Sequence, residues 1–233
     1  MYCILKINKK NSGFTLIEIL LALMIMAGVC AATYMTFSVV STAWKKGMAM
    51  SDDLHHGDFA IEQLVMALRS AYYPQTGGGN GMYGFQMKNN GGGENSSDVI
   101  SWVKLGGALV GTDCPFCESP HRVQFWVGEN KDGENCGAVR AWQLQGQAED
   151  FDPEKVSPQF ISREITGFKC RVSYRKVNDE VEWLDEWEDA LTNKLPTMVE
   201  VTLYMRPLSD GEKAVEVKRV VTIPVAPLSG PWK

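Results

Sequence analysis

The stretch Phe14-Thr15-Leu16-Ile17-Glu18, followed by ILLALMIMAGVCAATYMTFSVVSTAW over residues 19–44, decides how this chain is built. Residues 19–44 contain no Asp, Glu, Lys, Arg or His. A helix of that length rises about 39 Å, which exceeds the roughly 30 Å hydrocarbon core of a bilayer. We therefore expect residues 14–44 to form one membrane-spanning helix that carries a single charge, on Glu18.

The charges that flank this helix predict its orientation. Lys6, Lys9 and Lys10 precede it, and cytoplasmic flanks are enriched in Lys and Arg. Lys45 and Lys46 follow it and weaken the asymmetry slightly. The pattern favours a single-pass protein of the inner membrane with a cytoplasmic N-terminus and a periplasmic C-terminal head. The chain has 23 basic and 28 acidic residues, a net charge of −5, so we expect no nucleic-acid partner.

Three ordinary explanations of the apolar segment compete. A cleaved secretory signal has a shorter apolar core and an A-x-A-like site, which is missing here. A lipoprotein signal ending at Cys30 would have a small residue in place of Val29. A plain signal anchor does not account for Glu18, because a carboxylate within a spanning helix costs about 2.5–3.5 kcal/mol and marks a functional position. The alternative interpretation is that the Glu18 side chain has no special function and extends to the nearby cytoplasmic membrane interface.

The run Lys9-Lys10-Asn11-Ser12-Gly13-Phe14-Thr15-Leu16-Ile17-Glu18 resembles the prepilin-type signal of type IV pilins and of type II secretion pseudopilins. The resemblance implies that a prepilin peptidase cuts between Gly13 and Phe14 and then methylates the new amino group of Phe14. Glu18 would become the fifth residue of the mature chain. A carboxylate at that place could pair with the amino terminus of a neighbouring subunit, so that both charges are neutralised and the stagger between subunits is set.

Five parts follow from the sequence: a leader at 1–13, the transmembrane segment at 14–44, a periplasmic amphipathic helix at 45–74, a Gly-rich loop at 75–98 and a β-rich head at 99–233. The amphipathic helix is predicted from apolar residues at helical spacing, namely Leu54, Ile61, Val65, Leu68 and Tyr72. Six strands are expected near residues 99–103, 123–127, 138–144, 168–175, 198–205 and 215–223. The expected fold class is α+β, with a long N-terminal helix packed on an antiparallel sheet, as in pilins.

Residues 160–206 carry a second resemblance. A strand that begins at Ile165-Thr166-Gly167-Phe168 is followed by Trp183, Trp187, the pair Leu195-Pro196 and a strand from Met198. This order resembles the minor pseudopilin J of type II secretion systems. It implies a structural protein at the tip of a periplasmic pseudopilus, with the minor pseudopilins I and K and the major pseudopilin as partners. A type IV pilus or competence minor pilin is the alternative within the class.

Trp183 and Trp187 lie four residues apart, which would place them on one face of a short helix or turn. They either pack on the edge of the sheet or form a surface for a partner. The acidic residues around them, from Asp179 to Asp189, invite a calcium hypothesis, but no EF-hand spacing is present and a solvated face is favoured.

The cysteines leave several arrangements open. Cys3 falls in the leader and Cys30 in the span, while Cys114, Cys117, Cys136 and Cys170 belong to the head. An oxidising compartment favours disulfides, whose pairing the sequence does not fix. The set Cys114, Cys117, His121 and Cys136 could instead bind zinc, and the C-P-F-C motif could be a redox pair.

We expect no catalytic activity and no cofactor. The chain has 3 histidines and no G-x-S-x-G motif. Outside the pilin-like class, the competing hypothesis is a membrane-anchored periplasmic binding module that carries a zinc or disulfide knob.

Overall fold

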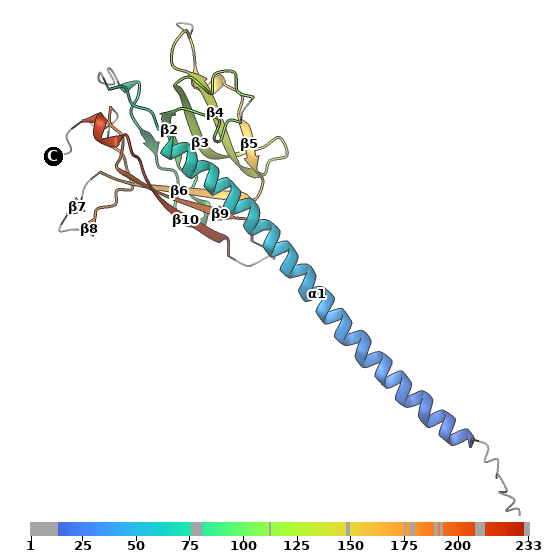
Figure 1. The fold of residues 1–233 in the computed structure, drawn as a ribbon. Helices are drawn as coiled ribbons and strands as arrows, with labels where there is room; N and C mark the ends of the chain where they lie inside the picture. Colours follow the sequence, from blue (N-terminus) through green and yellow to red (C-terminus); the bar gives the residue numbers. More distant parts are fainter. Residues whose placement is uncertain are drawn as a thin grey trace, which may run out of the picture. The chain divides into compact units, whose positions relative to one another are not determined.

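The computed structural model describes residues 14–75, 81–111, 113–147, 150–174, 176–177, 180–188, 191, 193–207 and 213–230. It divides the chain into two compact units, Met1–Ala49 and Met50–Lys233. The long helix α1 (Leu16–Arg69) contributes to both units, and the strands all belong to the second (Figure 1). The leader, residues 1–13, lies outside the described residues.

The apolar part of α1 that could cross a membrane is Leu16–Met48, somewhat longer than the 14–44 expected from the sequence. None of its most apolar window is buried by the rest of the protein. The helix ends at Arg69 rather than near Pro74. It ends there because the next residues pair with the sheet: the Tyr72 amide donates to the Val103 carbonyl at 2.8 Å.

The first sheet has five antiparallel strands in the order β1-β2-β3-β4-β5. They are β1 (Gln86–Lys88), β2 (Val99–Lys104), β3 (His121–Glu129), β4 (Asn135–Gln143) and β5 (Gln159–Ser162). Strands β3 and β4 form a hairpin whose register runs from Glu129 opposite Asn135 to His121 opposite Gln143. This register places His121, which follows the Cys114–Cys117 segment, and Cys136 at opposite ends of the hairpin.

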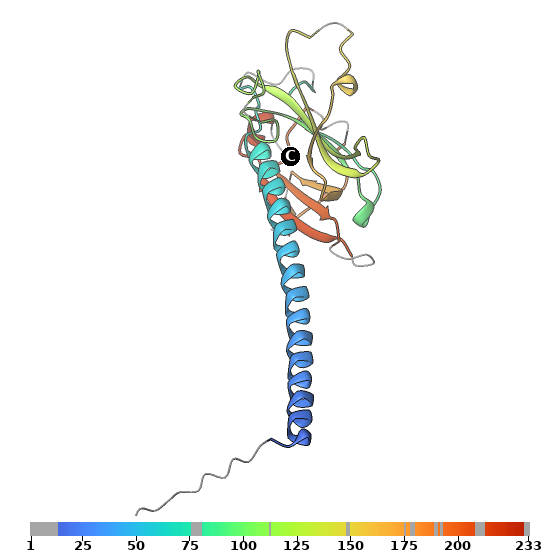
Figure 2. The same ribbon diagram turned by 90° about the vertical axis from the view of Figure 1, so that its right-hand side faces the viewer.

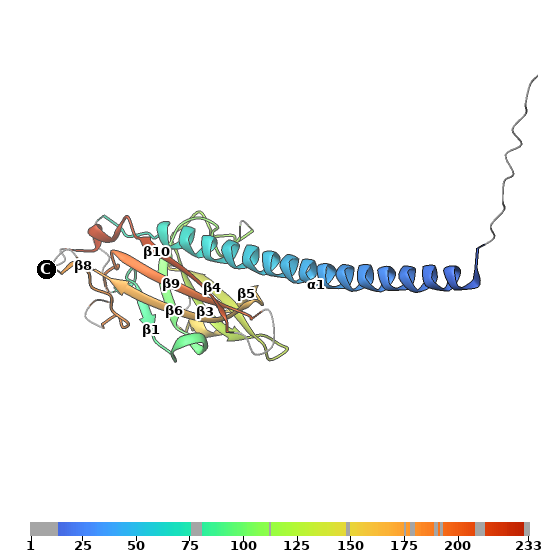
Figure 3. The ribbon, with the colours of Figure 1, turned by 90° about the horizontal axis from the view of Figure 1, so that it is seen from below.

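The second sheet has the order β10-β9-β6, and its strands lie side by side in Figure 3. They are β6 (Ile165–Ser173), β9 (Met198–Met205) and β10 (Val215–Thr222). A short ladder pairs β7 (Lys176–Val177) with β8 (Glu180–Val181). Short 3-10 turns also lie in the described part of the chain: η2 (Gly93–Asn95), η3 (Pro153–Lys155) and η5 (Ala226–Ser229).

The two sheets are joined where the chain enters β2. The Phe168 amide donates to the Ser96 carbonyl at 2.7 Å, and the Asp98 amide donates to the Phe168 carbonyl at 3.1 Å. The buried Asp98 carboxylate accepts the Cys170 amide at 2.9 Å, and burial raises the pKa of this carboxyl. Gly167 is required here, since a Cβ would lie 2.3 Å from the Glu94 carbonyl oxygen of η2. Two backbone hydrogen bonds and the Asp98 carboxylate thus tie β6 to the segment that enters the first sheet.

The core of the second unit forms between the end of α1 and both sheets. Ile61, Leu64 and Leu68 on α1 are 0% exposed, in agreement with the amphipathic period. The buried Trp102 of β2 donates its indole N–H to the Ala67 carbonyl at 3.0 Å. Figure 2 shows the C-terminal turns of α1 next to the orange-to-red strands, where Arg219 of β10 lies 3.4 Å from the Asp58 carboxylate.

The fold class agrees with the expectation: a long N-terminal helix precedes antiparallel sheets in an α+β arrangement. The six main strands lie where the alternating apolar runs predicted them. Residues 75–98, expected as a Gly-rich loop, contain more structure than that. They include β1, η2 and the fully buried Phe85, whose amide donates to the Lys194 carbonyl at 2.9 Å.

Candidate functional sites

The first turn of α1 is closed by a reciprocal pair of residues. Glu18 Oε2 accepts the Thr15 backbone amide at 2.9 Å and the Thr15 hydroxyl at 3.1 Å. The Glu18 amide in turn lies 3.4 Å from the Thr15 hydroxyl oxygen. This is a capping box, in which two donors at the helix start are satisfied by the side chains of the N-cap and N3 residues. The carboxylate is therefore held at the positive end of the helix dipole.

An apolar stripe surrounds this carboxylate. Phe14, Glu18, Ala22 and Met26 recur every four residues and line one shallow groove with Ile19 and Leu23. The Phe14 side chain is 84% exposed, and every residue of this stripe is solvent-exposed within the protein. Among the described residues, no cation lies within ion-pair distance of Glu18. The stripe thus presents an acidic group in a face that nothing within the described chain covers.

Glu18 was expected to act in assembly, and its role as part of a helix cap emerges only from the structure. The four residues Thr15-Leu16-Ile17-Glu18 match the T-x-x-E pattern that marks a capping box ahead of an apolar run. Gly13, the residue expected before the cleavage point, lies outside the described residues. Phe14 is the first residue described.

The structure separates the two tryptophans that the sequence analysis grouped. Trp187 is 6% exposed and packs edge-on against Phe85 and Tyr174, with ring centroids 6.2 Å apart in each pair. Trp183 is half-buried, and the Arg171 guanidinium lies 5.8 Å from its ring centroid. No helical turn joins residues 183–187, because Leu184 pairs with Val172 of β6 as an isolated bridge.

The burial of Trp187 favours the alternative in which this side chain packs on the edge of the sheet. Its side chain belongs to the core of the second unit, as the alternative of packing on the sheet edge had it. Trp183 keeps part of its surface exposed, and a role for it in contacting a partner remains a hypothesis.

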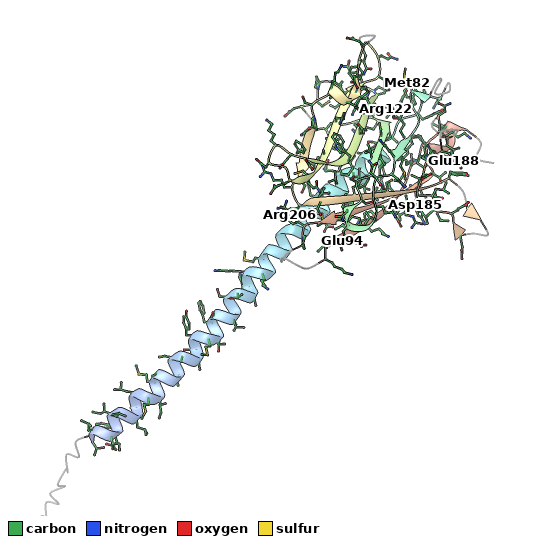
Figure 4. All side chains as sticks on the ribbon, turned by 180° about the vertical axis from the view of Figure 1, so that it is seen from behind. Met82, Glu94, Arg122, Asp185, Glu188 and Arg206 are labelled. Carbon is green, nitrogen blue, oxygen red and sulfur yellow. The ribbon has the colours of Figure 1, made fainter. Side chains whose placement is uncertain are left out.

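The acidic segment beside these tryptophans is neutralised within the protein at one position. Asp185 is labelled in Figure 4; its carboxylate lies 3.5 Å from the Lys169 ammonium and 3.5 Å from the Arg171 guanidinium. Across the described part of the chain, no group of three or more His, Cys, Asp or Glu side chains is placed to hold a metal ion. This finding gives the calcium hypothesis no support among these residues.

The zinc hypothesis is corrected by the register of the β3–β4 hairpin. His121 lies opposite Gln143, whereas Cys136 lies opposite Gly128. Gln143 lies seven positions after Cys136 along β4, which is about 24 Å at a rise of about 3.4 Å per residue. Cys136 is thus far too distant to share a metal ion with His121, Cys114 and Cys117. The described cysteines also form no disulfide in this structure.

The Cys114-Pro115-Phe116-Cys117 segment lies over a buried pair of basic side chains. Lys104, 0% exposed, directs its ammonium nitrogen to 3.3 Å from His121 Nε2. His121 Nδ1 lies 2.8 Å from the Ser119 carbonyl, and the Phe116 ring packs edge-on against the imidazole. Burial lowers the pKa of Lys104 to about 8, although the thiols of Cys114 and Cys117 oppose this shift. The two sulfurs are therefore close electrostatic neighbours of a buried ammonium.

Comparison with known proteins supports the interpretation of the N-terminal residues as a prepilin-type signal. The family described as the prokaryotic N-terminal methylation motif matches residues 8–34. The structure is similar to that of a type IV-like pilin from Thermus thermophilus, with 8% sequence identity and a TM-score of 0.40, over 76% of this chain and 98% of that chain. No curated protein sequence matches the chain.

The chain thus carries a prepilin-type N-methylation signal. Such a signal implies processing by a prepilin peptidase and assembly with other pilin-like subunits. The apolar helix that follows the signal is compatible with a single-pass membrane anchor.

Proposed function

We propose that this protein is a structural, non-enzymatic minor pseudopilin of a type II secretion system, of the J type. It is anchored by Leu16–Met48 in the inner membrane, with its N-terminus in the cytoplasm and its head in the periplasm. At the tip of a short pseudopilus it assembles with the minor pseudopilins I and K and with the major pseudopilin. This tip supports the export of folded proteins.

The observation that carries the proposal is the placement of Glu18. Its carboxylate is fixed on the first helical turn by Thr15, four residues after Phe14 and within an uncovered apolar stripe. Cleavage after Gly13 would create an α-amine on Phe14, which is mostly cationic at neutral pH. In lipid both charges are costly alone, so pairing between neighbouring subunits stabilises assembly in one axial stagger.

The choice of the J type rests on the C-terminal half of the sequence. The order of a strand, two tryptophans, Leu195-Pro196 and a second strand is the feature that resembles J. In the fold these parts are β6, the segment 182–188, the buried Leu195 and β9. A type IV pilus or competence minor pilin is the second candidate, because related minor pilins share part of this order.

The decisive experiment is co-expression of the full chain with and without a prepilin peptidase, followed by intact-mass measurement and N-terminal sequencing. The proposal expects loss of residues 1–13 and one added methyl group on Phe14. A Gly13→Val variant serves as the matched control and should stay unprocessed. If a peptidase that cuts a control prepilin leaves this chain intact, the anchored binding module replaces the pilin-like proposal.

A second experiment separates the secretion system from the pilus. The processed chain is co-expressed with the I- and K-type pseudopilins in one strain and with minor pilins of a type IV pilus in another, and complexes are purified from detergent extracts. Selective recovery with the I- and K-type pseudopilins supports the proposal. Selective recovery with the pilus subunits supports the second candidate.

A further inference from the structure

The C-P-F-C segment folds into a tight turn that brings its two cysteines together. The Cys117 amide donates to the Cys114 carbonyl at 3.2 Å, and the Ser119 amide donates to the Phe116 carbonyl at 3.1 Å. A β-turn places its first and fourth Cα atoms within about 7 Å. A disulfide needs Cα atoms roughly 4.4–6.8 Å apart, so this turn has the spacing that a bond between Cys114 and Cys117 requires.

The surroundings hold this turn in place. The Gly106 amide donates to the Cys117 carbonyl at 2.7 Å, and the Lys104 ammonium donates to the Gly106 carbonyl. Within the described residues, no carboxylate forms an ion pair with the buried Lys104. Cys114 and Cys117 act electrostatically on Lys104 and oppose the lowering of its pKa by burial, so the turn lies beside this ammonium.

The pair is also accessible from outside. Cys114 and Cys117 are both half-buried. Cys114, together with Pro115 and Phe116, lines an open cleft of about 400 Å³ whose other wall includes Val139 and Arg140 of β4. A small disulfide, or the exposed disulfide of an oxidising protein, can therefore approach the turn.

The other two cysteines of the head are poor partners for this pair. Cys136 sits at the far end of the β3–β4 hairpin from His121 and its loop, about 24 Å along the strand. Cys170 is 0% exposed on β6, and burial raises its pKa well above the ordinary value. Both are therefore unsuited to exchange with the turn without unfolding of the sheets.

We propose that Cys114 and Cys117 form a disulfide across their turn by exchange with a disulfide-bonded oxidant. One thiolate attacks a sulfur of the oxidant, forms a mixed disulfide and expels one thiolate. The second cysteine then attacks the sulfur of the first and expels the other thiolate. The chain loses two electrons and two protons, and the oxidant is reduced to two thiols. In the cell this step rests on the proposed periplasmic location, because that compartment supplies such oxidants.

The test uses the full chain in detergent micelles, equilibrated with mixtures of reduced and oxidised glutathione. The thiols are trapped with acid and then alkylated, and the protein is digested with trypsin. Cleavage after Lys104 and Arg122 leaves both cysteines on one peptide, residues 105–122. Under oxidising conditions the expected peptide lacks two hydrogens and carries no alkyl group. After treatment with dithiothreitol it carries two.

Matched variants identify the bond. Cys136→Ser should keep the linked peptide, whereas Cys114→Ser and Cys117→Ser should each leave one cysteine that alkylates or carries a single glutathione. The proposal is overturned if both cysteines of the wild-type peptide alkylate in every glutathione mixture, or if either is found bonded to Cys136, to Cys170 or to a second chain. The result is independent of peptidase processing, so failure here leaves the pseudopilin proposal standing, and the converse also holds.

Discussion

The two parts of α1 place the same kinds of side chain in opposite surroundings. In the part that belongs to the first unit, Leu20 and Leu23 are 50% and 60% exposed. In the part that belongs to the second unit, Leu64 and Leu68 are 0% exposed. The second part is amphipathic and covered by the sheets, whereas the first is apolar on all its faces. The second part of α1 therefore buries its apolar face against the rest of its own chain. The first part has the length and composition of a segment that lies in lipid.

The same contrast applies to charge. Lys104 in the head is buried, yet its ammonium has the Gly106 carbonyl and His121 as neighbours in the chain. Glu18 in the anchor is bonded to Thr15 alone among the described residues and stands in an uncovered apolar stripe. A group that is satisfied within the chain contributes to folding, and a group that is left uncovered is available for assembly. In the predictions below, the anchor is the first unit, Met1–Ala49, and the head is the second unit, Met50–Lys233. Each prediction compares two positions, one of which serves as the control.

The largest expected effect concerns packing. Leu64→Ala should lower the free energy of unfolding of the head by about 2–5 kcal/mol, because it leaves a cavity in the core. Leu23→Ala, an identical change in the anchor, should alter it by less than about 0.5 kcal/mol. Urea unfolding of the full chain in a mild detergent, followed by tryptophan fluorescence, measures both values. Equal losses for the two variants would contradict the expectation that Leu64 contributes to the folding of the second unit and Leu23 does not.

A slightly smaller effect concerns the buried lysine. Its pKa in the folded protein is about 8, below the ordinary 10.5, so between these values the unfolded chain binds a proton that the folded chain has released. Stability should therefore rise as the pH increases from about 8 to 10.5, by up to about 3 kcal/mol. Other groups titrate in the same range, and burial of Cys170 and Tyr204 acts in the opposite direction.

The contribution of Lys104 is isolated by difference. Unfolding free energies are measured across this pH range for the wild type and for Lys104→Met, with the cysteines held reduced. The variant should lack the rise, and Lys88→Met, at an exposed position of β1, should retain it. If the unfolding free energy of Lys104→Met depends on pH as that of the wild type does, Lys104 is not the cause of the rise.

Assembly should respond to the uncovered charge. Glu18→Gln should reduce crosslinking of the processed chain to the major pseudopilin in inner membranes by at least about tenfold, because loss of one partner of a desolvated pair costs roughly 2–5 kcal/mol. Glu62→Gln, on an exposed face of the second part of α1, should have little effect. The head should unfold at the same urea concentration in both variants. Unchanged crosslinking in Glu18→Gln would show that this carboxylate does not set assembly.

The smallest effect concerns the capping box. Thr15→Ala should weaken the first turn of α1 by about 1 kcal/mol, since the side-chain cap of the helix is lost. Amide hydrogen exchange at Glu18 in micelles should become roughly fivefold faster. Thr36→Ala provides the control, because its hydroxyl donates to the Ala32 carbonyl within the helix and caps no end. Equal rates in wild type and Thr15→Ala would leave Glu18 fixed by something other than Thr15.

Much of the fold was predictable because local patterns and tertiary structure agree. The strand from Met198 to Met205 is nearly all apolar or β-branched and became β9, the central strand of its sheet. The structure of segment 75–98 was harder to predict, because its many glycines indicated a loop. Its apolar residues Phe85 and Met87 nevertheless pack in or against the core. Trp187 was ambiguous for a related reason: its spacing from Trp183 suggested a helical face, but backbone bonds to Val172 hold the segment extended.

By itself the sequence determined the membrane-length helix, the acidic fifth residue after the expected cleavage point and the positions of the main strands, because these depend on hydrophobicity and periodicity along neighbouring residues. The tertiary structure decided which cysteines lie together, that Cys136 is remote from His121, and that Trp187 is core. Those questions depend on strand register and on which distant segments meet. A shift of one residue in register reverses which side chains face the core, and spacing along the chain does not encode it.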